Sequence, residues 1–365
     1  MGLHLVGLGT ATPPHVIRQD DAVSMAHLTC DAQGQSSSAI AQLYRRTGVR
    51  TRHCIILDSS TNGAPARQTF YAPAAQGRRH GPTTGQRMQA YESDAAVLAA
   101  EAAQSALLDA GLAGRDVTHL VTASCTGFQA PGVDLSLCEA LNLPVNVTRT
   151  HIGFMGCHAA LNALRVADAF ATSDAESCVL VCAVELCSLH FQYSGQSQHL
   201  VSNALFADGA AAIVARGHRT GSWGALIATN STRLPATSHL MSWRIRDHGF
   251  EMTLSSRVPS VIRRELQPWI SRWLATMGLE VDDIGAWAIH PGGPRVLDAC
   301  GESLKLSDAS LEPSREVLAN YGNMSSPTVL FVLDEIRREL PGKRCVMLAF
   351  GPGLTIEAVL IDLAR

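Results

Sequence analysis

The sequence predicts a layered α/β fold, and two observations support this prediction. Apolar runs of strand length alternate with helical stretches throughout both halves of the chain. In addition, Phe206-Ala-Asp-Gly209 and Phe350-Gly-Pro-Gly353 occupy matching places in the two halves, which indicates a weak internal duplication. We therefore expect two similar halves, residues 1–220 and 221–365, that share one layered architecture.

The composition narrows the class of protein. The chain has 365 residues, of which 46% are hydrophobic and 17% charged, as is typical of a soluble globular protein. A formal net charge of -3 argues against nucleic-acid binding, and no apolar run is long enough to span a membrane. The start of the chain lacks a basic segment and a cleavage site, so we expect a cytoplasmic protein with reduced cysteines. Since no Cys-x-x-Cys pair occurs, we expect no metal site.

The first half begins with a strand at residues 3–9. Its Gly7-x-Gly9 pair lacks the third glycine of a dinucleotide-binding fingerprint and is followed by two prolines, which argues against that function. Residues 38–46 predict a helix that ends in a basic cluster. Residues 59–87 are rich in Ser, Gly, Pro, Ala, Thr and Gln and predict a loop. Residues 90–113 then predict an amphipathic helix.

The other predicted elements continue this alternation. Strands that are covered on both faces show continuous apolar runs, and a Pro-Gly or Gly-rich turn marks where each run ends. Helices are expected where such a turn opens a longer apolar stretch. The elements lie at residues 119–127, 177–185 and 205–215 in the first half and at 285–293, 322–335 and 345–361 in the second.

One cysteine lies in a stretch that is typical of a reactive thiol. Residues 148–153 predict a short strand and Gly153-Phe-Met-Gly156 a tight turn, and an Ala- and Leu-rich helix follows from residue 159, so Cys157 lies near the helix N-terminus. The positive end of the helix dipole favours a thiolate at this point. Taken alone, a cysteine in an apolar stretch is more often a small buried hydrophobic residue.

Two other glycine-flanked turns present groups that can act together with this thiol. His290 follows a predicted strand, and Asn323 precedes a predicted helix. In layered α/β folds, strand ends and helix starts of this kind meet at one site. An imidazole can accept the proton of Cys157, and an imidazole and a carboxamide can both donate to a thioester oxygen. The order Cys, His, Asn also occurs in papain-like proteases, but their local signature around the cysteine is absent.

Four segments give this arrangement a specific interpretation. They are Gly153-Phe-Met-Gly-Cys157-His-Ala-Ala, Ala288-Ile-His290-Pro-Gly-Gly-Pro294, Tyr321-Gly-Asn323-Met-Ser-Ser-Pro-Thr-Val-Leu-Phe-Val-Leu-Asp-Glu335 and Phe350-Gly-Pro-Gly-Leu-Thr-Ile-Glu357. With these segments the chain resembles the type III polyketide synthases, the chalcone-synthase-like family, over nearly its whole length. The related ketoacyl-carrier-protein synthase III enzymes share the Cys, His and Asn but in different flanking sequence.

The resemblance implies a thiolase fold with αβαβα layers and two pseudo-repeated halves, a homodimer, and no metal or redox cofactor. It also implies that Cys157 takes an acyl group from a starter acyl-CoA. His290 and Asn323 would then stabilise the enolate that forms when malonyl-CoA loses CO2. Phe206 matches an aromatic residue at the pocket mouth of the family, where it would help to keep the malonyl carboxylate away from water and so favour decarboxylation.

The same resemblance implies a coenzyme A site. Arg46, Arg50 and Arg52 match the region that binds the CoA phosphates in the family, although a basic cluster is more often a solvated surface patch. Gly293 begins a turn that lies beside the pantetheine arm in the family.

The expected substrate pocket departs from that of plant chalcone synthases. Its residues are Gly351 and Pro352 together with the departing positions Cys125, Ala130, His190, Ser202, Trp243 and Met252. Trp243 would fill space, whereas Ser202 leaves the wall open and Ala130 makes room from the neighbouring subunit. Met252 is flexible and tolerates varied shapes.

These departures favour an aliphatic acyl starter and an alkylpyrone or alkylresorcinol product. A malonyl-primed, naphthalene-type product is the alternative, because Cys125 resembles that branch of the family. An enzyme like ketoacyl-carrier-protein synthase III, and a protein of this fold that binds acyl chains without turnover, are further alternatives.

Overall fold

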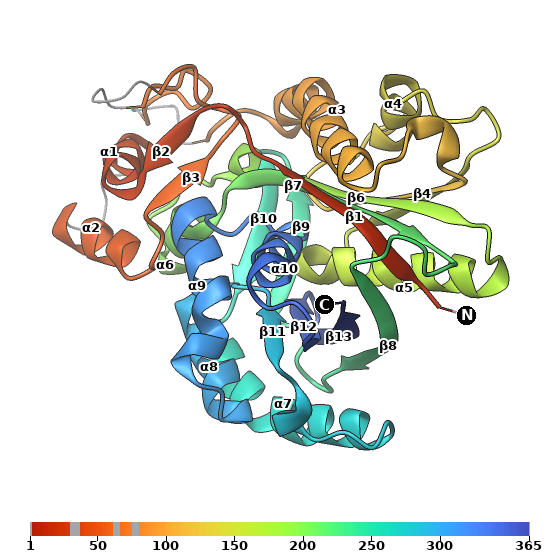
Figure 1. The fold of residues 1–365 in the computed structure, drawn as a ribbon. Helices are drawn as coiled ribbons and strands as arrows, with labels where there is room; N and C mark the ends of the chain where they lie inside the picture. The colour runs from red at the N-terminus through yellow and green to blue at the C-terminus, as the bar shows by residue number, and fades with distance from the viewer. Residues whose placement is uncertain (1, 30–36, 61–65, 75–79, 365) are drawn as a thin grey trace.

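A nine-stranded sheet forms the centre of the protein (Figure 1). The computed structural model describes residues 2–29, 37–60, 66–74 and 80–364. The strands are β1 (His4–Ala11), β2 (Val16–Arg18), β3 (Thr51–His53), β4 (His119–Ser124), β5 (Thr148–Gly153), β6 (Cys178–Leu186), β7 (Asp208–Arg216), β8 (Gly224–Arg233), β9 (Met241–Arg246), β10 (Gly249–Leu254), β11 (Ala286–Ile289), β12 (Arg344–Gly351) and β13 (Thr355–Leu363). The helices are α1 (Gln19–Thr29), α2 (Ser37–Arg45), α3 (Thr84–Asp109), α4 (Val133–Ala140), α5 (Ala159–Ser173), α6 (Ser197–Leu205), α7 (Val258–Ala275), α8 (Pro294–Leu304), α9 (Asp308–Tyr321) and α10 (Thr328–Glu339).

The order of the strands shows the predicted duplication. The large sheet runs β11-β12-β13-β8-β1-β7-β6-β4-β5. From the centre outward, β1, β7, β6 and β4 pair antiparallel, antiparallel and parallel, and β8, β13, β12 and β11 repeat the same pattern. The two halves join where β1 pairs with β8 at His4–Ala225 and Leu5–Gly224. The division near residue 220 falls between β7 and β8, but as a domain boundary it stays a prediction, because one sheet runs through both halves.

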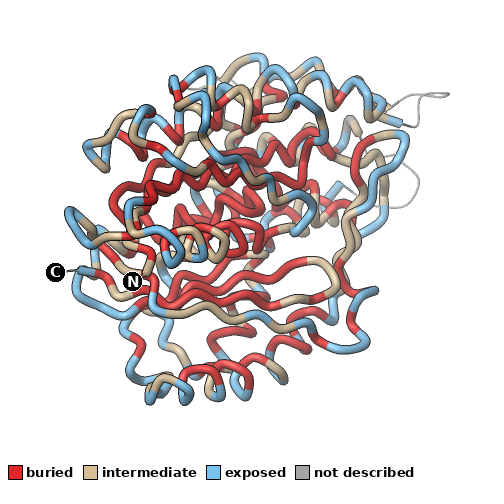
Figure 2. The backbone as a smooth tube through the Cα atoms, turned by 90° about the vertical axis from the view of Figure 1, so that its right-hand side faces the viewer, coloured by how far each residue is buried: buried red, intermediate tan, exposed pale blue. Residues whose placement is uncertain are grey.

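The layers alternate as expected for a thiolase fold. In Figure 1, α3 and α4 lie above the strands of the first half, whereas α7 and α8 lie at the opposite, lower side of the molecule. Helices α5 and α10 lie between the two half-sheets: α5 contacts β4 and β6 but also β13, and α10 contacts β11 and β12 but also β1 and β7. Figure 2 shows these inner layers as buried backbone, with exposed residues mainly on the outer helices. The middle layer therefore belongs to both halves.

The core follows from the apolar runs in the sequence. Every residue of β6 is buried, as expected for a strand that is covered on both faces. One apolar cluster fills the space around α5 and α10, and two others lie under α3 and under α7 and α8. Within the described residues, no helix is both long and apolar enough to cross a membrane.

The long helix of the first half differs from its prediction at both ends. It covers Thr84–Asp109 instead of residues 90–113. Thr83 caps it, because its hydroxyl accepts the Gln86 N–H while the Gln86 side chain accepts the Thr83 N–H. The end of the predicted 59–87 loop is therefore helical, and residues 61–65 and 75–79 of that loop lie outside the described part of the chain.

Candidate active site

Cys157 lies where the sequence predicts it, in a single turn before α5. That turn, η2 (Gly156–His158), leads directly into the helix. Gly156 has φ +70°, and a Cβ atom there would lie 2.3 Å from Cδ of Pro352. Only glycine fits both the backbone angle and the close approach of the Phe350-Gly-Pro-Gly turn. The second half of the chain thus packs against the turn that holds the thiol.

Burial makes the resting thiol weakly acidic. Cys157 is buried, and burial raises the pKa of its thiol to about 12. The lowered pKa that a helix N-terminus favours is therefore not found for this thiol, because desolvation outweighs the dipole. One contact lowers the pKa of this thiol: the Ser325 hydroxyl donates to Cys157 Sγ across 3.5 Å. The thiolate consequently needs partners that this pocket or a bound substrate supplies.

Asn323 is locked beside Phe206 before the start of α10. Its N–H donates to Leu205 O at 2.9 Å, and its own carbonyl oxygen accepts the Ala207 N–H at 2.9 Å, so the two segments form a short parallel bridge. The Asn323 side-chain oxygen accepts the Ser325 N–H at 2.8 Å. That bond uses the acceptor of the amide and leaves its NH2 group as the donor that can face a substrate.

His290 follows β11 and is a neutral imidazole. The backbone N–H of His290 donates to Leu348 O at 2.7 Å, which fixes the residue against β12. The side chain is 1% exposed, and neither ring nitrogen has a hydrogen-bond partner within the described residues. Burial, and then the nearby His158, lower the pKa of His290 to about 3. Unpaired buried polar atoms are rare in folded proteins, and a neutral ring in this state is suited to bind a ligand oxygen.

A cavity over Cys157 brings many of the predicted pocket residues together. Its lining residues are Cys125, Thr126, Gly156, Cys157, Cys187, Phe206, Met241, Trp243, Met252, Ser325 and Pro352. A second cavity shares Cys187, Phe206, Trp243 and Met252 with the first and adds His190 and Ser202. Gly351 lies behind the first cavity, where a Cβ atom would collide with the His158 ring at 2.1 Å. Ala130 is exposed and lines neither cavity.

His190 and Trp243 close the floor between these cavities. The Trp243 indole N–H donates to the Cys125 carbonyl at 2.7 Å. His190 Nε2 lies 2.7 Å from Thr126 O and its Nδ1 accepts the Phe250 N–H at 3.0 Å, which fixes the neutral tautomer with the proton on Nε2. Burial lowers the pKa of His190 to about 3. The hairpin β9–β10 is thereby fastened to the turn after β4.

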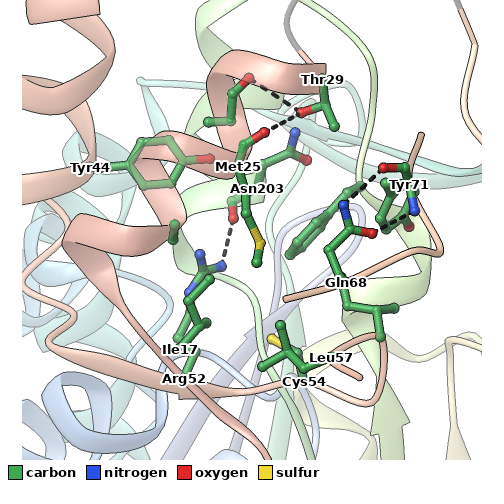
Figure 3. A pocket seen from close by; sticks show the side chains of 14 residues that line it. Ile17, Met25, Thr29, Tyr44, Arg52, Cys54, Leu57, Gln68, Tyr71 and Asn203 are labelled. Atoms are coloured by element: carbon green, nitrogen blue, oxygen red, sulfur yellow. Dashed lines mark hydrogen bonds between the residues drawn. The ribbon is translucent and has the colours of Figure 1, made fainter. Parts of the chain in front are cut away.

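The predicted arginine cluster separates into different environments. Arg52 is 2% exposed and donates from one terminal nitrogen to the carbonyls of Asn203 and Phe206, at 2.6 and 2.8 Å. Figure 3 shows its guanidinium inside a pocket near Met25 and Asn203. It therefore supports the Phe206 turn, and its predicted role at the CoA phosphates is corrected. Arg50 is exposed and pairs with Glu316 at 2.6 Å, and Arg46 is exposed. Gly293, with φ +143°, precedes the first residue of α8.

Comparison with known proteins agrees with this geometry. The family model "Chalcone and stilbene synthases, N-terminal domain" matches residues 2–218, and the corresponding C-terminal domain model matches residues 225–364. The chain belongs to the chalcone and stilbene synthase family. It is thus a type III polyketide synthase, an acyltransferase with the thiolase fold.

Relatives and solved structures extend this result. The chain is 36% identical to "1,3,6,8-tetrahydroxynaphthalene synthase" of Streptomyces peucetius, over 99% of this chain and 93% of the relative. It is 32% identical to "Alpha-pyrone synthesis polyketide synthase-like Pks18" of Mycobacterium tuberculosis, over 98% and 91%. The crystal structure of PKS-I from the brown alga Ectocarpus siliculosus superposes with a TM-score of 0.91 at 29% identity and covers 99% of this chain and 98% of its own.

The site of this type III polyketide synthase includes residues that the sequence analysis did not single out. Ser325 contacts Cys157, although it lies inside the quoted segment around Asn323. Glu185 is fully buried and accepts from Cys125 N–H, Thr126 Oγ1 and Ser326 Oγ, each at 2.8 Å. Burial raises the pKa of Glu185 to about 7. A carboxylate in the otherwise apolar run at residues 177–185 was the signal that could have identified it.

Proposed function

We propose that Cys157 carries the growing acyl chain and that His290 and Asn323 act on malonyl-CoA. The observation that carries this proposal is the convergence of the starts of α5 and α10 on one apolar cavity, with Cys157 on one side and Asn323, through Ser325, on the other. His290, at the end of β11, lies close enough to His158 of the Cys157 turn for that ring to lower its pKa, and within the described residues its ring nitrogens have no hydrogen-bond partner.

The first half-reaction loads the enzyme. A His290 ring nitrogen accepts the Cys157 proton, and the thiolate attacks the carbonyl carbon of an acyl-CoA. The C–S bond to CoA breaks, and the CoA sulfur leaves with the proton from the imidazolium. Because burial opposes both charges, we expect thiolate and imidazolium to form together, each stabilising the other.

The second half-reaction extends the chain. Malonyl-CoA loses CO2, and the electron pair of the broken C–C bond forms an enolate of acetyl-CoA. The NH2 group of Asn323 and the N–H of neutral His290 donate to the enolate oxygen. The carbanion then attacks the Cys157 thioester carbonyl and releases the Cys157 thiolate. Phe206, buried and bridged to Asn323, lies where it excludes water from the malonyl carboxylate, so that loss of neutral CO2 is favoured.

We propose an aliphatic acyl-CoA as the starter and a pyrone or resorcinol as the product. The cavity beside Cys157 is lined mainly by apolar and sulfur-containing side chains, including Met241, Trp243 and Met252. Such a wall binds an alkyl chain and offers few partners to the hydroxyl of an aromatic acid. Trp243 and His190, held by hydrogen bonds, limit how far that chain extends.

The alternative product is a malonyl-primed naphthalene. Cys125 lines the same cavity as Cys157, and the relative from Streptomyces peucetius carries the name of a tetrahydroxynaphthalene synthase. Malonyl-CoA supplied alone distinguishes the two proposals, because an aliphatic starter would then be absent. Product formation that requires a carrier protein would instead favour an enzyme like ketoacyl-carrier-protein synthase III.

The remaining expectations are part of the same proposal. Arg46 and Arg50, both exposed, are proposed to contact CoA phosphates and Gly293 its pantetheine arm. The reaction is proposed to need only acyl-CoA and malonyl-CoA, without a metal or redox cofactor, in the cytoplasm.

A homodimer is proposed on the edge of the sheet at β5. Among the described strands, β5 pairs with β4 alone, and all of its residues are exposed or half-buried. Phe128, Phe154 and Met155 are exposed apolar side chains of the segments beside it. Ala130 lies in this region, so that it would face the partner subunit's cavity. Light scattering of the purified protein tests the dimer.

The decisive experiment supplies malonyl-CoA with a series of acyl-CoA chain lengths. Mass spectrometry follows the products and the acyl group on Cys157. The proposal predicts acylation of Cys157 and pyrone or resorcinol products from aliphatic starters. Neither acylation nor CO2 release across the whole series would contradict it.

A further inference from the structure

We propose that Ser325 is a further catalytic residue of this site, whose hydroxyl stabilises the Cys157 thiolate and whose backbone N–H fixes the Asn323 amide. The inference rests on the proposed function, because it needs Cys157 to be the nucleophile. It adds a residue, Ser325, that links the proposed nucleophile Cys157 in the first half to the proposed donor Asn323 in the second half.

The first observation is the contact with the nucleophile itself. Ser325 Oγ donates to Cys157 Sγ across 3.5 Å, and both residues are buried in the same cavity. In the described part of the chain, no other side chain donates a hydrogen bond to this sulfur. A hydroxyl that donates to a neutral thiol donates more strongly to the thiolate, since bonds to charged acceptors are about twice as strong.

The second observation is the backbone at this serine. Ser325 has φ +58°, in the left-handed region that disfavours any residue with a Cβ atom. Glycine would adopt this angle without cost. A serine at such a position indicates that its hydroxyl offsets the strain, and strained backbone of this kind clusters at active sites.

The third observation connects Ser325 to Asn323. The Ser325 N–H donates to the side-chain oxygen of Asn323 at 2.8 Å. Rotation of the amide by half a turn would place its NH2 group against this N–H, so the bond holds the amide in one orientation. The same residue that donates to the nucleophile thus also aims the donor that receives the enolate oxygen.

The surroundings of Cys157 make such a donor important. Glu185 on β6 opposes a charge on the sulfur, and Cys125 after β4 and Cys187 after β6 line the same cavity. His158 in η2 and His290 after β11 are neutral, because burial lowers the pKa of both. In the described residues none of these groups donates a hydrogen bond to the sulfur, and none carries the positive charge that would stabilise a thiolate. The Ser325 hydroxyl needs no change of protonation to do so.

The test is the pH dependence of alkylation of Cys157 by iodoacetamide, since only the thiolate reacts. The full-length protein is labelled without substrate, and mass spectrometry of the Cys157 peptide gives the rate. In Ser325→Ala we expect the rate at pH 7 to fall about tenfold and the midpoint of the pH profile to rise by about one unit. Ser325→Gly should show the same decrease in alkylation rate as Ser325→Ala. It should melt at a higher temperature than Ser325→Ala, because glycine relieves the backbone strain.

Ser326→Ala is the matched control, since it removes the hydroxyl of the next residue in the same turn. Its hydroxyl donates to Glu185 instead of Cys157. Losing that donor favours the protonated, neutral form of Glu185, which opposes a charge on Cys157 less strongly. The midpoint of the Cys157 alkylation profile should therefore stay unchanged or fall. The inference is wrong if Cys157 of Ser325→Ala is alkylated with the wild-type rate and midpoint. It is also wrong if Ser326→Ala raises the midpoint as much as Ser325→Ala does. Wild-type protein that takes no acyl group on Cys157 from any acyl-CoA would instead contradict the proposed function.

Discussion

The two halves of the chain repeat one arrangement of strands and helices but place different chemical groups at equivalent points. Strands β4 and β11 occupy equivalent places, and the residues that follow them are Cys125 and His290. Helices α5 and α10 also correspond, yet Cys157 precedes the first, whereas Asn323 and Ser325 precede the second. In the proposed mechanism the first half supplies the nucleophile, and the second half supplies the base and the donors.

This difference is effective because the two helices share the middle layer. Helices α5 and α10 each contact strands of both half-sheets, so their starts open onto one cavity. A duplicated framework thereby places two different sets of groups face to face without a long loop. Variants in the two halves should therefore impair different steps of one reaction.

The largest effect is expected in the first half, from Cys157→Ala. Without the thiol no acyl-enzyme can form, and we expect product formation to fall by at least about 1,000-fold. Intact-mass spectrometry should show no acyl adduct. Cys125→Ala, which changes the equivalent of His290 in the repeat, should retain the adduct; an adduct on Cys157→Ala would mean that another residue is the nucleophile.

In the second half, Asn323→Asp should impair the decarboxylation of malonyl-CoA. A carboxylate still accepts the Ser325 N–H but cannot donate to the enolate oxygen, and it adds a negative charge there. We expect CO2 release from malonyl-CoA to fall by about 100-fold or more, as for loss of an oxyanion donor. Release of labelled CO2 measures this step. Asn142→Asp, the same change at an exposed position after α4, should behave as wild type.

The hairpin β9–β10 sharpens the comparison, because the matching place in the first half, between β1 and α3, holds the two-stranded sheet of β2 and β3, whose residues line neither cavity. Trp243 on β9 closes the cavity against Cys125. Trp243→Ala should lower the free energy of unfolding by about 3 kcal/mol and raise kcat/KM for longer acyl-CoA starters by about tenfold relative to short ones. Competition between two chain lengths, followed by product mass, measures the preference. An unchanged preference would show that Trp243 does not limit the starter.

The smallest effect concerns β6, which carries the buried carboxyl of Glu185 where the equivalent strand β12 carries none. Burial raises the pKa of Glu185 from its ordinary 4.5 to about 7. The folded state therefore holds this proton more tightly, and the associated stability is fully present below pH 4.5 and lost as the pH rises through about 7.

Glu185→Gln should remove this dependence. Between these two pH values the free energy of unfolding of the wild type should fall relative to the variant by about 3 kcal/mol. Urea unfolding at several pH values measures the difference, and the buried histidines contribute equally to both proteins. Parallel curves for the two proteins would mean that folding leaves the pKa of Glu185 near its ordinary value.

Much of the fold could be predicted because the layered architecture leaves local marks. The buried strand at 177–185 shows a continuous apolar run, and the Gly-rich turn before Cys157 lies against the Pro352 turn as its glycines require. The family segments then indicated which residues meet. These signals are local in sequence, so a single chain displays them.

The errors concern contacts between distant segments. Arg52 looked like a surface cation, but the carbonyls that bury it come from Asn203 and Phe206, about 150 positions away in the chain. Ser325 carried no signal of its own, because its role depends on a left-handed backbone angle and on a sulfur 168 positions earlier. Physical proximity of this kind has no periodicity or spacing from which it could be inferred.

The central claim is that Cys157 of the first half carries the acyl group while His290 and Asn323 of the second half promote CO2 release. It is tested most directly by CO2 release from malonyl-CoA in Cys157→Ala. His290, Asn323 and Phe206 are intact in this variant. The account predicts that CO2 release continues within about tenfold of the wild-type rate although no acyl-enzyme forms. Loss of CO2 release to the level of Asn323→Asp would contradict the account, because Cys157 would then be needed for the step assigned to the second half.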